Sequence, residues 1–184
     1  MLMKEFRALS PEQIRFKDKR ELVTRHDLKV NRFLVEKIRH AYPSHSILSE
    51  EEGFNKGKSK HSGYQWVIDP LDGTKEFIKK NGEFTVNIAL INNGNPILGI
   101  IYIPVSKTLY FATYKHGSYK IETNIININE HTILSELIAM ATKLPYIFTK
   151  DNFTVVSSRS HKNEISPPHD NPFNKENKKV ELVN

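Results

Sequence analysis

The chain has 184 residues, 38% of them hydrophobic and 10% aromatic, which is enough to bury the core of one ordinary domain. Its 27 basic residues give a net charge of +6 but are scattered, without the basic and aromatic face that binds nucleic acid polymers, so we expect no such partner. The absence of cysteine excludes disulfides and thiolate metal sites, and we expect neither an integral membrane segment nor a secretory signal.

The first part of the chain predicts a polar segment followed by one long helix. Residues 1–20 are polar and charged. Over Arg25–Ala41 the apolar residues recur at helical spacing, and Thr24 is a suitable N-cap. Tyr42-Pro43 ends this helix, because the residue before a proline is disfavoured in the helical conformation.

The middle of the chain predicts strands, turns and one short helix. A strand at Ile47-Leu48 leads into the acidic Ser49-Glu50-Glu51, and a polar loop is expected at Phe54–Gly63. The next elements in chain order are a strand at Tyr64–Ile68, a turn at Asp69–Thr74 and a brief helix at Thr74–Lys80. The later strands are expected at Phe84–Asn92, Ile97–Pro104, Thr108–Tyr114, Ser118–Ile121 and Phe153–Ser157, with a helix at Glu130–Thr142.

These elements predict an α+β fold in which a mainly antiparallel sheet is flanked by helices in a layered αβα arrangement. The domain is expected to span residues 21–161. Residues 162–184 are rich in Asn, Lys, Pro and Glu with almost no apolar content, so they predict a disordered tail.

The most informative segment is Asp69-Pro70-Leu71-Asp72-Gly73-Thr74, which follows an apolar strand. Its turn breaks the alternation of the strand, so Asp69 and Asp72 are able to converge, and two converging carboxylates favour a cation between them. Hard oxygen ligands of this kind suit Mg²⁺. Gly73 and Thr74 open the short helix, where backbone N–H groups favour an anion such as phosphate. The alternative is a surface turn that caps a helix.

Two further segments supply acidic groups that are expected to meet the same point. Glu50 follows a short strand, although three consecutive glutamates are also typical of a solvated turn. Asp27 lies in the first turn of the long helix, where a carboxylate also interacts favourably with the helix dipole without any other role. Metal ligands beside a phosphate site predict metal-assisted phosphoryl transfer to water.

The combined motifs resemble the inositol monophosphatase superfamily of Mg²⁺-dependent, lithium-sensitive phosphatases, which have a layered sugar-phosphatase-like fold. The motifs that carry this resemblance are Leu22-Val23-Thr24-x-x-Asp27, Ser49-Glu50-Glu51 and Asp69-Pro70-Leu71-Asp72-Gly73-Thr74. Further segments are similar to one branch, the bacterial CysQ-type 3′(2′),5′-bisphosphate nucleotidases. They are Gly73–Ile78, Gly82–Leu90 and Val155–His161.

The resemblance implies a role for each matching residue. The implied metal ligands are Glu50, Asp69, Asp72 and the backbone carbonyl of Leu71. Gly73 and Thr74 would hold the phosphate, and Thr74, hydrogen-bonded to Asp27, would help Glu50 to orient and deprotonate a water activated by the metal.

Other residues near these motifs have less definite roles. Lys75 is expected either to contact an anionic substrate or to point to solvent, and the same holds for Arg159 with its neighbours Ser160 and His161. Glu51 is expected to support the ligands without binding the metal. His26 is expected to be an exposed helix residue.

The resemblance also implies that the chain is incomplete. Members of the family continue after the segment that matches Ser158–His161 into a second α/β half, which carries a Trp-Asp-x-Ala-Ala-Gly motif that completes the second metal site. No such motif occurs in Ser160–Asn184, so we expect a truncated protein in which a second metal binds weakly.

The resemblance implies an Mg²⁺-dependent phosphate monoester hydrolase that converts adenosine 3′,5′-bisphosphate to AMP and phosphate. The alternatives are an inositol or sugar monophosphate phosphatase, and an inactive remnant that binds Mg²⁺ and phosphate without turnover. The expected location is cytoplasmic, with peripheral association with the inner membrane as an alternative, and nothing in the sequence excludes a homo-oligomer.

Overall fold

A computed structural model describes Met3, Phe6 and residues 14–16, 22–55, 57, 62–124, 129, 131–144, 153–156 and 180–183. The chain divides into two compact units, Met1–Pro145 and Tyr146–Asn184. Within the described helices, none combines the length and the apolar character needed to cross a bilayer.

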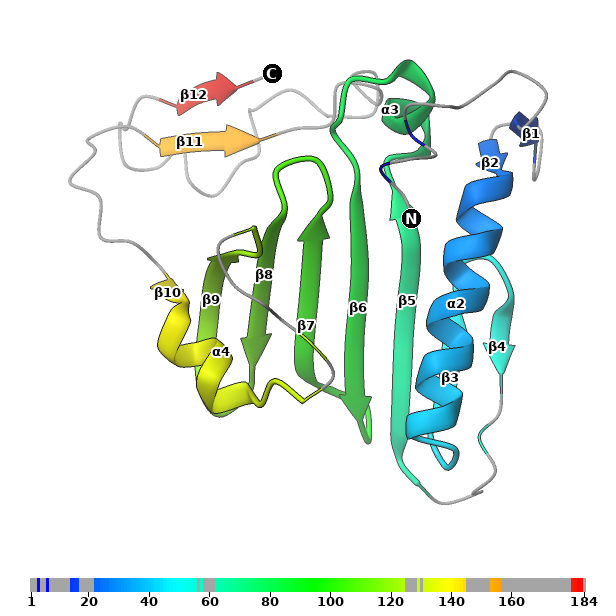
Figure 1. Ribbon diagram of the computed structural model, residues 1–184, viewed down its shortest axis with the longest axis vertical. Helices are drawn as coiled ribbons and strands as arrows, with labels where there is room; N and C mark the ends of the chain where they lie inside the picture. Colours follow the sequence, from blue (N-terminus) through cyan, green and yellow to red (C-terminus); the bar gives the residue numbers. More distant parts are fainter. Residues whose placement is uncertain are drawn as a thin grey trace. The chain divides into compact units, whose positions relative to one another are not determined.

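The first unit is built on an eight-stranded sheet with the strand order β10-β9-β8-β7-β6-β5-β3-β4 (Figure 1). Its strands are β3 Ser46–Ser49, β4 Gly53–Asn55, β5 Tyr64–Asp72, β6 Thr85–Asn92, β7 Asn95–Ile103, β8 Thr108–Thr113, β9 Gly117–Glu122 and β10 Thr142–Leu144. All neighbouring pairs are antiparallel except β3 and β5, which are parallel. The predicted mainly antiparallel sheet flanked by helices is confirmed.

Three helices are described in this unit: α2 Arg25–Ala41, α3 Thr74–Lys79 and α4 Leu134–Met140. The predicted range of the long helix is confirmed by α2. The helix predicted at Glu130–Thr142 is too long at both ends, because α4 begins at Leu134 and Thr142 pairs with Lys120 in strand β10. The loop predicted from Phe54 is also wrong at its start, since Phe54 pairs with Leu48 in the β3–β4 hairpin.

Helices α2 and α4 cover the same face of the sheet (Figure 1). Ile68, Ile88, Ile100 and Phe111 are successive register partners from β5 to β8, so their side chains form one row on one face. Val35 of α2 packs at one end of this row, and residues of α4 pack at the other end. This row therefore connects the two apolar clusters that the helices cover.

A smaller apolar cluster lies beside the segment Asp69–Thr74. It consists of Leu71, Phe77 and Phe84, each no more than 2% exposed. Phe77 and Phe84 meet edge to face with ring centroids 5.0 Å apart, and Phe6 packs on both rings. This cluster anchors helix α3 and the end of β5 to each other, which gives the polar residues around them a rigid base.

The ends of the chain are only partly described. Strand β1 Ile14–Phe16 pairs antiparallel with β2 Leu22–Thr24, which leads directly into α2. In the second unit, β11 Phe153–Val156 pairs parallel with β12 Val180–Val183. Most of the predicted disordered tail lies outside the described residues, and the proposed domain limits at residues 21 and 161 stay predictions.

Candidate metal and phosphate site

The two aspartates of the central motif are brought to one face of the sheet by a β-bulge. In β5, Asp69 pairs with Asn87 and Asp72 pairs with Thr85, so three steps on β5 match two steps on β6. Three regular steps would place Asp69 and Asp72 on opposite faces, and the extra residue cancels this alternation. The predicted turn at Asp69–Thr74 is therefore wrong in form, since β5 continues to Asp72, but the break in alternation is present.

The carboxyl group of Asp69 lies in a strongly acidic environment. Burial, a hydrogen bond with Glu50 and the charges of Glu50 and Asp72 raise the pKa of Asp69 from about 3.8 to about 7. The backbone N–H of Leu71, 3.1 Å from Asp69 Oδ1, opposes this rise. A carboxylate whose pKa is raised by neighbouring carboxylates is stabilised in its ionised form by a bound cation, so the donor set fits a hard divalent ion.

The carboxylates do not yet form a closed metal cage. Within the described residues, no group of three or more His, Cys, Asp or Glu side chains is arranged to hold a metal ion. Asp72 is exposed, and its Oδ2 accepts a hydrogen bond from Asn87 Nδ2 at 3.1 Å. The half-buried Asp69 is therefore the centre of the acidic cluster, and the exposed Glu50 and Asp72 lie at its rim.

Glu50 is placed by the backbone at the end of β3. Its N–H donates to the carbonyl oxygen of Ile68 at 3.1 Å, one residue before Asp69 on the parallel neighbour β5. Because the carboxyl ends of parallel strands lie at the same edge of a sheet, Glu50 and Asp69 meet there. The structure thus brings Glu50 and Asp69 together, and their role as metal ligands stays a prediction.

Gly73 joins the end of β5 to helix α3 with a backbone conformation that side chains disfavour. Its φ is +92°, and a Cβ at this position would lie 2.8 Å from the carbonyl oxygen of Glu83. A glycine is therefore required here for both conformation and space. It also starts the helix, since the N–H of Phe77 donates to the Gly73 carbonyl at 2.9 Å.

Thr74 and Asp27 form the predicted pair between α3 and α2. Thr74 Oγ1 lies 3.1 Å from Asp27 Oδ1 and 3.2 Å from the Leu71 carbonyl oxygen. The hydroxyl has one proton, so these two acceptors compete for it. Asp27 is 1% exposed, although a charged residue in the first turn of a helix is usually solvated.

The environment of His26 contradicts its prediction. It is 5% exposed, not an exposed helix residue, and its ring lies 5.8 Å from that of Phe77. The first turn of α2 is covered by α3, since Phe77 contacts His26 and Thr74 bonds Asp27. Lys75 is half-buried in the first turn of α3, while Arg159, Ser160 and His161 lie outside the described residues.

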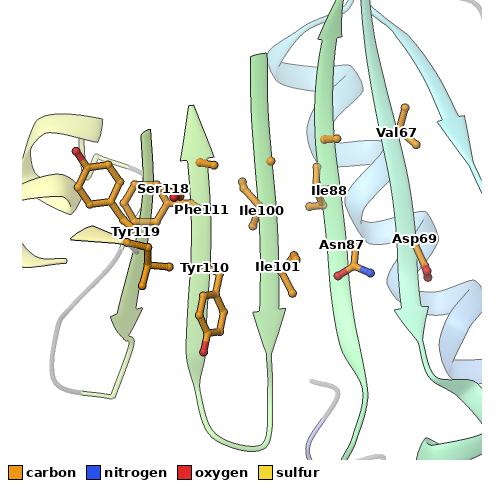
Figure 2. A pocket seen from close by; sticks show the side chains of 14 residues that line it. Val67, Asp69, Asn87, Ile88, Ile100, Ile101, Tyr110, Phe111, Ser118 and Tyr119 are labelled. Atoms are coloured by element: carbon orange, nitrogen blue, oxygen red, sulfur yellow. The ribbon is translucent and has the colours of Figure 1, made fainter. Parts of the chain in front are cut away.

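Polar residues that the motif did not include surround the carboxylates. Thr85 Oγ1 donates to Asn87 Oδ1 at 2.9 Å, which turns Nδ2 of Asn87 toward Asp72. Figure 2 shows Asn87 beside Asp69 on the neighbouring strand. An asparagine in the middle of an otherwise apolar strand was the signal that could have identified it.

The face of the sheet that carries Asp69 contains a cavity of about 520 Å³ (Figure 2). Asp69, Asn87, Ile101 and Tyr110 are successive register partners, and all four line it. This row alternates with the apolar row under α2, so it lies on the opposite face. Apart from the Asp69 and Asn87 edge, the lining is mostly apolar.

The match to known proteins covers most of the chain. Residues 1–178 match the model of the inositol monophosphatase family, so the chain belongs to this family. Among curated relatives, it is 42% identical over 111 residues to the 3′(2′),5′-bisphosphate nucleotidase CysQ of Salmonella typhimurium, covering 60% of this chain and 45% of the relative. It is also 34% identical over 122 residues to the inositol-1-monophosphatase of Bacillus subtilis, covering 65% and 45%.

A solved structure extends the similarity to the fold. CysQ from Bacteroides thetaiotaomicron, described as a bacterial member of the inositol monophosphatase family, aligns with a TM-score of 0.72 and 34% identity. The alignment covers 99% of this chain and 66% of that protein. The chain spans about half the length of the curated relatives that it matches.

Proposed function

We propose that this protein is a Mg²⁺-dependent phosphate monoester hydrolase whose substrate is adenosine 3′,5′-bisphosphate. The observation that carries the proposal is the acidic cluster of Asp69, Glu50 and Asp72. Asp72 is followed directly by Gly73-Thr74. The choice of a bisphosphorylated nucleotide is supported by the similarity to bisphosphate nucleotidases, which is higher than the similarity to the inositol-1-monophosphatase.

The proposed ligands of Mg²⁺ are the carboxylates of Glu50, Asp69 and Asp72 and the carbonyl of Leu71. Mg²⁺ usually takes one or two protein carboxylates and completes its shell with water and substrate phosphate, so a cluster without a closed cage suits it. When bound, the ion would neutralise phosphate charge and make water more acidic. The crowding that raises the pKa of Asp69 would be relieved by the same ion.

The remaining residues act on the water and the phosphate. Asp27 accepts a hydrogen bond from the Thr74 hydroxyl, so the lone pairs of the Thr74 oxygen would be available to accept a hydrogen bond from the attacking water. Glu50 would take the proton of that water as it attacks phosphorus and the ester oxygen leaves. Gly73 keeps the backbone open for a phosphate oxygen, and Lys75 and Arg159 are proposed to contact the charged substrate.

The test is release of phosphate by the whole chain from adenosine 3′,5′-bisphosphate, with Mg²⁺ and with added Li⁺. An Asp69→Ala variant is the negative control, and Glu122→Gln, which changes an exposed carboxylate at the end of β9, is the matched control. Release that depends on Mg²⁺ in the wild type and in Glu122→Gln, but not in Asp69→Ala, would support the proposal. Equal release by Asp69→Ala would contradict it.

A second candidate is hydrolysis of an inositol or sugar monophosphate, which the similarity to the Bacillus subtilis inositol-1-monophosphatase favours. The same assay with inositol 1-phosphate as the substrate distinguishes the two candidate functions. Faster release from inositol 1-phosphate than from the nucleotide would reject the nucleotide. Binding of Mg²⁺ with no release from either would indicate a protein that holds the ion and phosphate without turnover.

A further inference from the structure

Helix α2 carries two buried polar residues that lie one turn apart. Asp27 is 1% exposed and Asn31 is 0% exposed, and residues four apart lie on the same face of a helix. Asp27 accepts a hydrogen bond from Thr74, at the start of α3. Asn31 accepts a hydrogen bond from Ser49, at the end of β3. One face of α2 is therefore bonded to both chain segments that make up the candidate site.

The hydroxyl of Ser49 connects α2 to the turn that carries Glu50. Ser49 is 2% exposed; its Oγ donates to Asn31 Oδ1 and accepts the N–H of Glu51 at 3.3 Å. Glu50 lies between these two residues, and its own N–H donates to Ile68. The peptide groups on both sides of Glu50 are thus held in place, which limits the directions its side chain can take.

The orientation of the Asn31 amide follows from the hydrogen bonds of Ser49. The Asn31 amide is oriented with its oxygen toward Ser49, whose hydroxyl donates its single proton to that oxygen while accepting from Glu51. Asn31 Nδ2 then points away and has no hydrogen-bond partner in the described part of the chain. A leucine of similar size would avoid burying this N–H group, so the residue is more polar than packing requires.

We propose that Asn31 is a positioning residue that acts through Ser49 to hold the Glu50 carboxylate in the orientation that binds a divalent cation. Asp27 bonds Thr74 directly, whereas Asn31 reaches Glu50 through Ser49. The fixed spacing of Asp27 and Asn31 on α2 sets the distance between the two segments of the site. The inference rests on the proposed function, because it assumes that Glu50 is a metal ligand.

The experiment compares Ser49→Ala, Asn31→Leu and the double variant with the wild-type chain. Mg²⁺ binding is measured directly by calorimetry, and phosphate release is measured against Mg²⁺ concentration. The matched control is Ser46→Ala, which removes a hydroxyl from the same strand that donates to the Tyr64 carbonyl at 3.2 Å. Unfolding by urea shows whether each variant is folded, and Ser49→Ala decides the test if Asn31→Leu does not fold.

We expect each single variant to raise the Mg²⁺ dissociation constant about tenfold, as loss of an outer partner of a metal ligand commonly does. At saturating Mg²⁺ their kcat should stay close to that of the wild type. The double variant should bind no more weakly than the weaker single variant, because both substitutions remove the same hydrogen bond. Ser46→Ala should bind Mg²⁺ as the wild type does.

A purely structural role for Asn31 would give a different result. The variants would then lose stability to urea while their Mg²⁺ affinity stays within about twofold of Ser46→Ala, and the proposal would be rejected. A wild type that binds Mg²⁺ but releases no phosphate contradicts the proposed function alone, since the comparison of Mg²⁺ affinities still decides on Asn31. A wild type that does not bind Mg²⁺ contradicts both.

Discussion

Strand β5 begins and ends in two environments that differ in chemistry. At its start, the indole N–H of Trp66 donates to His45 Nδ1 at 3.1 Å, and the ring of His45 stacks on Tyr64 with centroids 4.7 Å apart. At its end, Asp69 and Asp72 lie on the same face, where Asp69 accepts the backbone N–H of Leu71 and Asp72 accepts the amide of Asn87. The first end is uncharged and aromatic, and the second end is acidic.

The difference separates residues that stabilise the fold from residues that stay ready for a ligand. The aromatic end buries surface and satisfies its polar groups with one another, which favours folding. The acidic end raises the pKa of Asp69 to about 7, which means that its ionised form is unfavourable in the folded, metal-free chain. Unfavourable charge of this kind is common at functional sites, where a ligand removes it.

The largest effect is expected at the aromatic end. Trp66→Ala should lower the free energy of unfolding by about 3–5 kcal/mol, because Trp66 is 7% exposed and its removal leaves a cavity beside Val35 and Ile47. Urea unfolding measures this. Where the variant is folded, its Mg²⁺ affinity should match that of the wild type. A parallel loss of Mg²⁺ affinity would show that the two ends of β5 are coupled.

The next effect is expected at the acidic end. Asp69→Asn should lower Mg²⁺-dependent phosphate release by more than about a hundredfold, since even an outer partner of a metal ligand is worth 10–100-fold. Phosphate release at fixed Mg²⁺ measures this, with Glu122→Gln as the control for loss of one carboxylate. If the activity of Asp69→Asn is within tenfold of that of Glu122→Gln, Asp69 is not a metal ligand of the site.

A smaller effect is expected beside the acidic end. Asn87→Leu and Thr85→Val should each raise the Mg²⁺ concentration for half-maximal release by about tenfold. The first removes the hydrogen bond that Asn87 donates to Asp72, and the second removes the bond that orients Asn87. Thr113→Val is the matched control, since this threonine also lies in a strand and its hydroxyl bonds His116 at 2.9 Å. If Thr85→Val and Thr113→Val shift the half-maximal Mg²⁺ concentration equally, the bond from Thr85 to Asn87 has no role in Mg²⁺ binding.

The smallest effects are opposite dependences of stability on pH. Asp69 has a raised pKa in the fold, so the folded state binds more protons than the unfolded state between about pH 4 and pH 7. Metal-free stability should therefore fall by about 1 kcal/mol as pH rises through that range, after allowance for solvent screening of a half-buried group.

His45 should act in the other direction. Burial lowers its pKa below 6.5, so the unfolded state binds more protons and stability should fall as pH drops below 6.5. Urea unfolding in EDTA across pH 4–8 measures both effects. Asp69→Asn should remove the first and His45→Gln the second; loss of both trends in either single variant would show that the two groups are not independent.

Regular elements of the fold were predictable because their signals are local. The apolar spacing of α2 and its proline stop gave its range of Arg25–Ala41, and the Asn93-Gly94 turn, with both φ angles positive, marked the β6–β7 hairpin. Strands β4 and β10 were missed, since each has only three residues and exists through pairing with β3 or β9. Three residues are too few to show a period.

The candidate site was predictable to the extent that its residues are consecutive or match a motif. Asp69, Asp72, Gly73 and Thr74 are close in sequence, and Glu50 follows a strand that a hydrophobic run revealed. The prediction for His26 was wrong because its burial depends on α3, which begins 48 positions later in the sequence. Asn87 stood out only as a polar residue in an apolar strand, and neither Asn31 nor the hydroxyl of Ser49 carried a local signal of its role.

The sequence by itself determined the helix α2, the succession of longer strands, the acidic and glycine-containing motif, and the membership of a family of phosphatases. The tertiary structure decided the bulge that puts Asp69 and Asp72 on one face, and the pairing of α2 with both segments of the site. The physical reason is that side-chain direction in a sheet depends on register, and the register of β5 is set by β6 residues that lie 13 to 28 positions away.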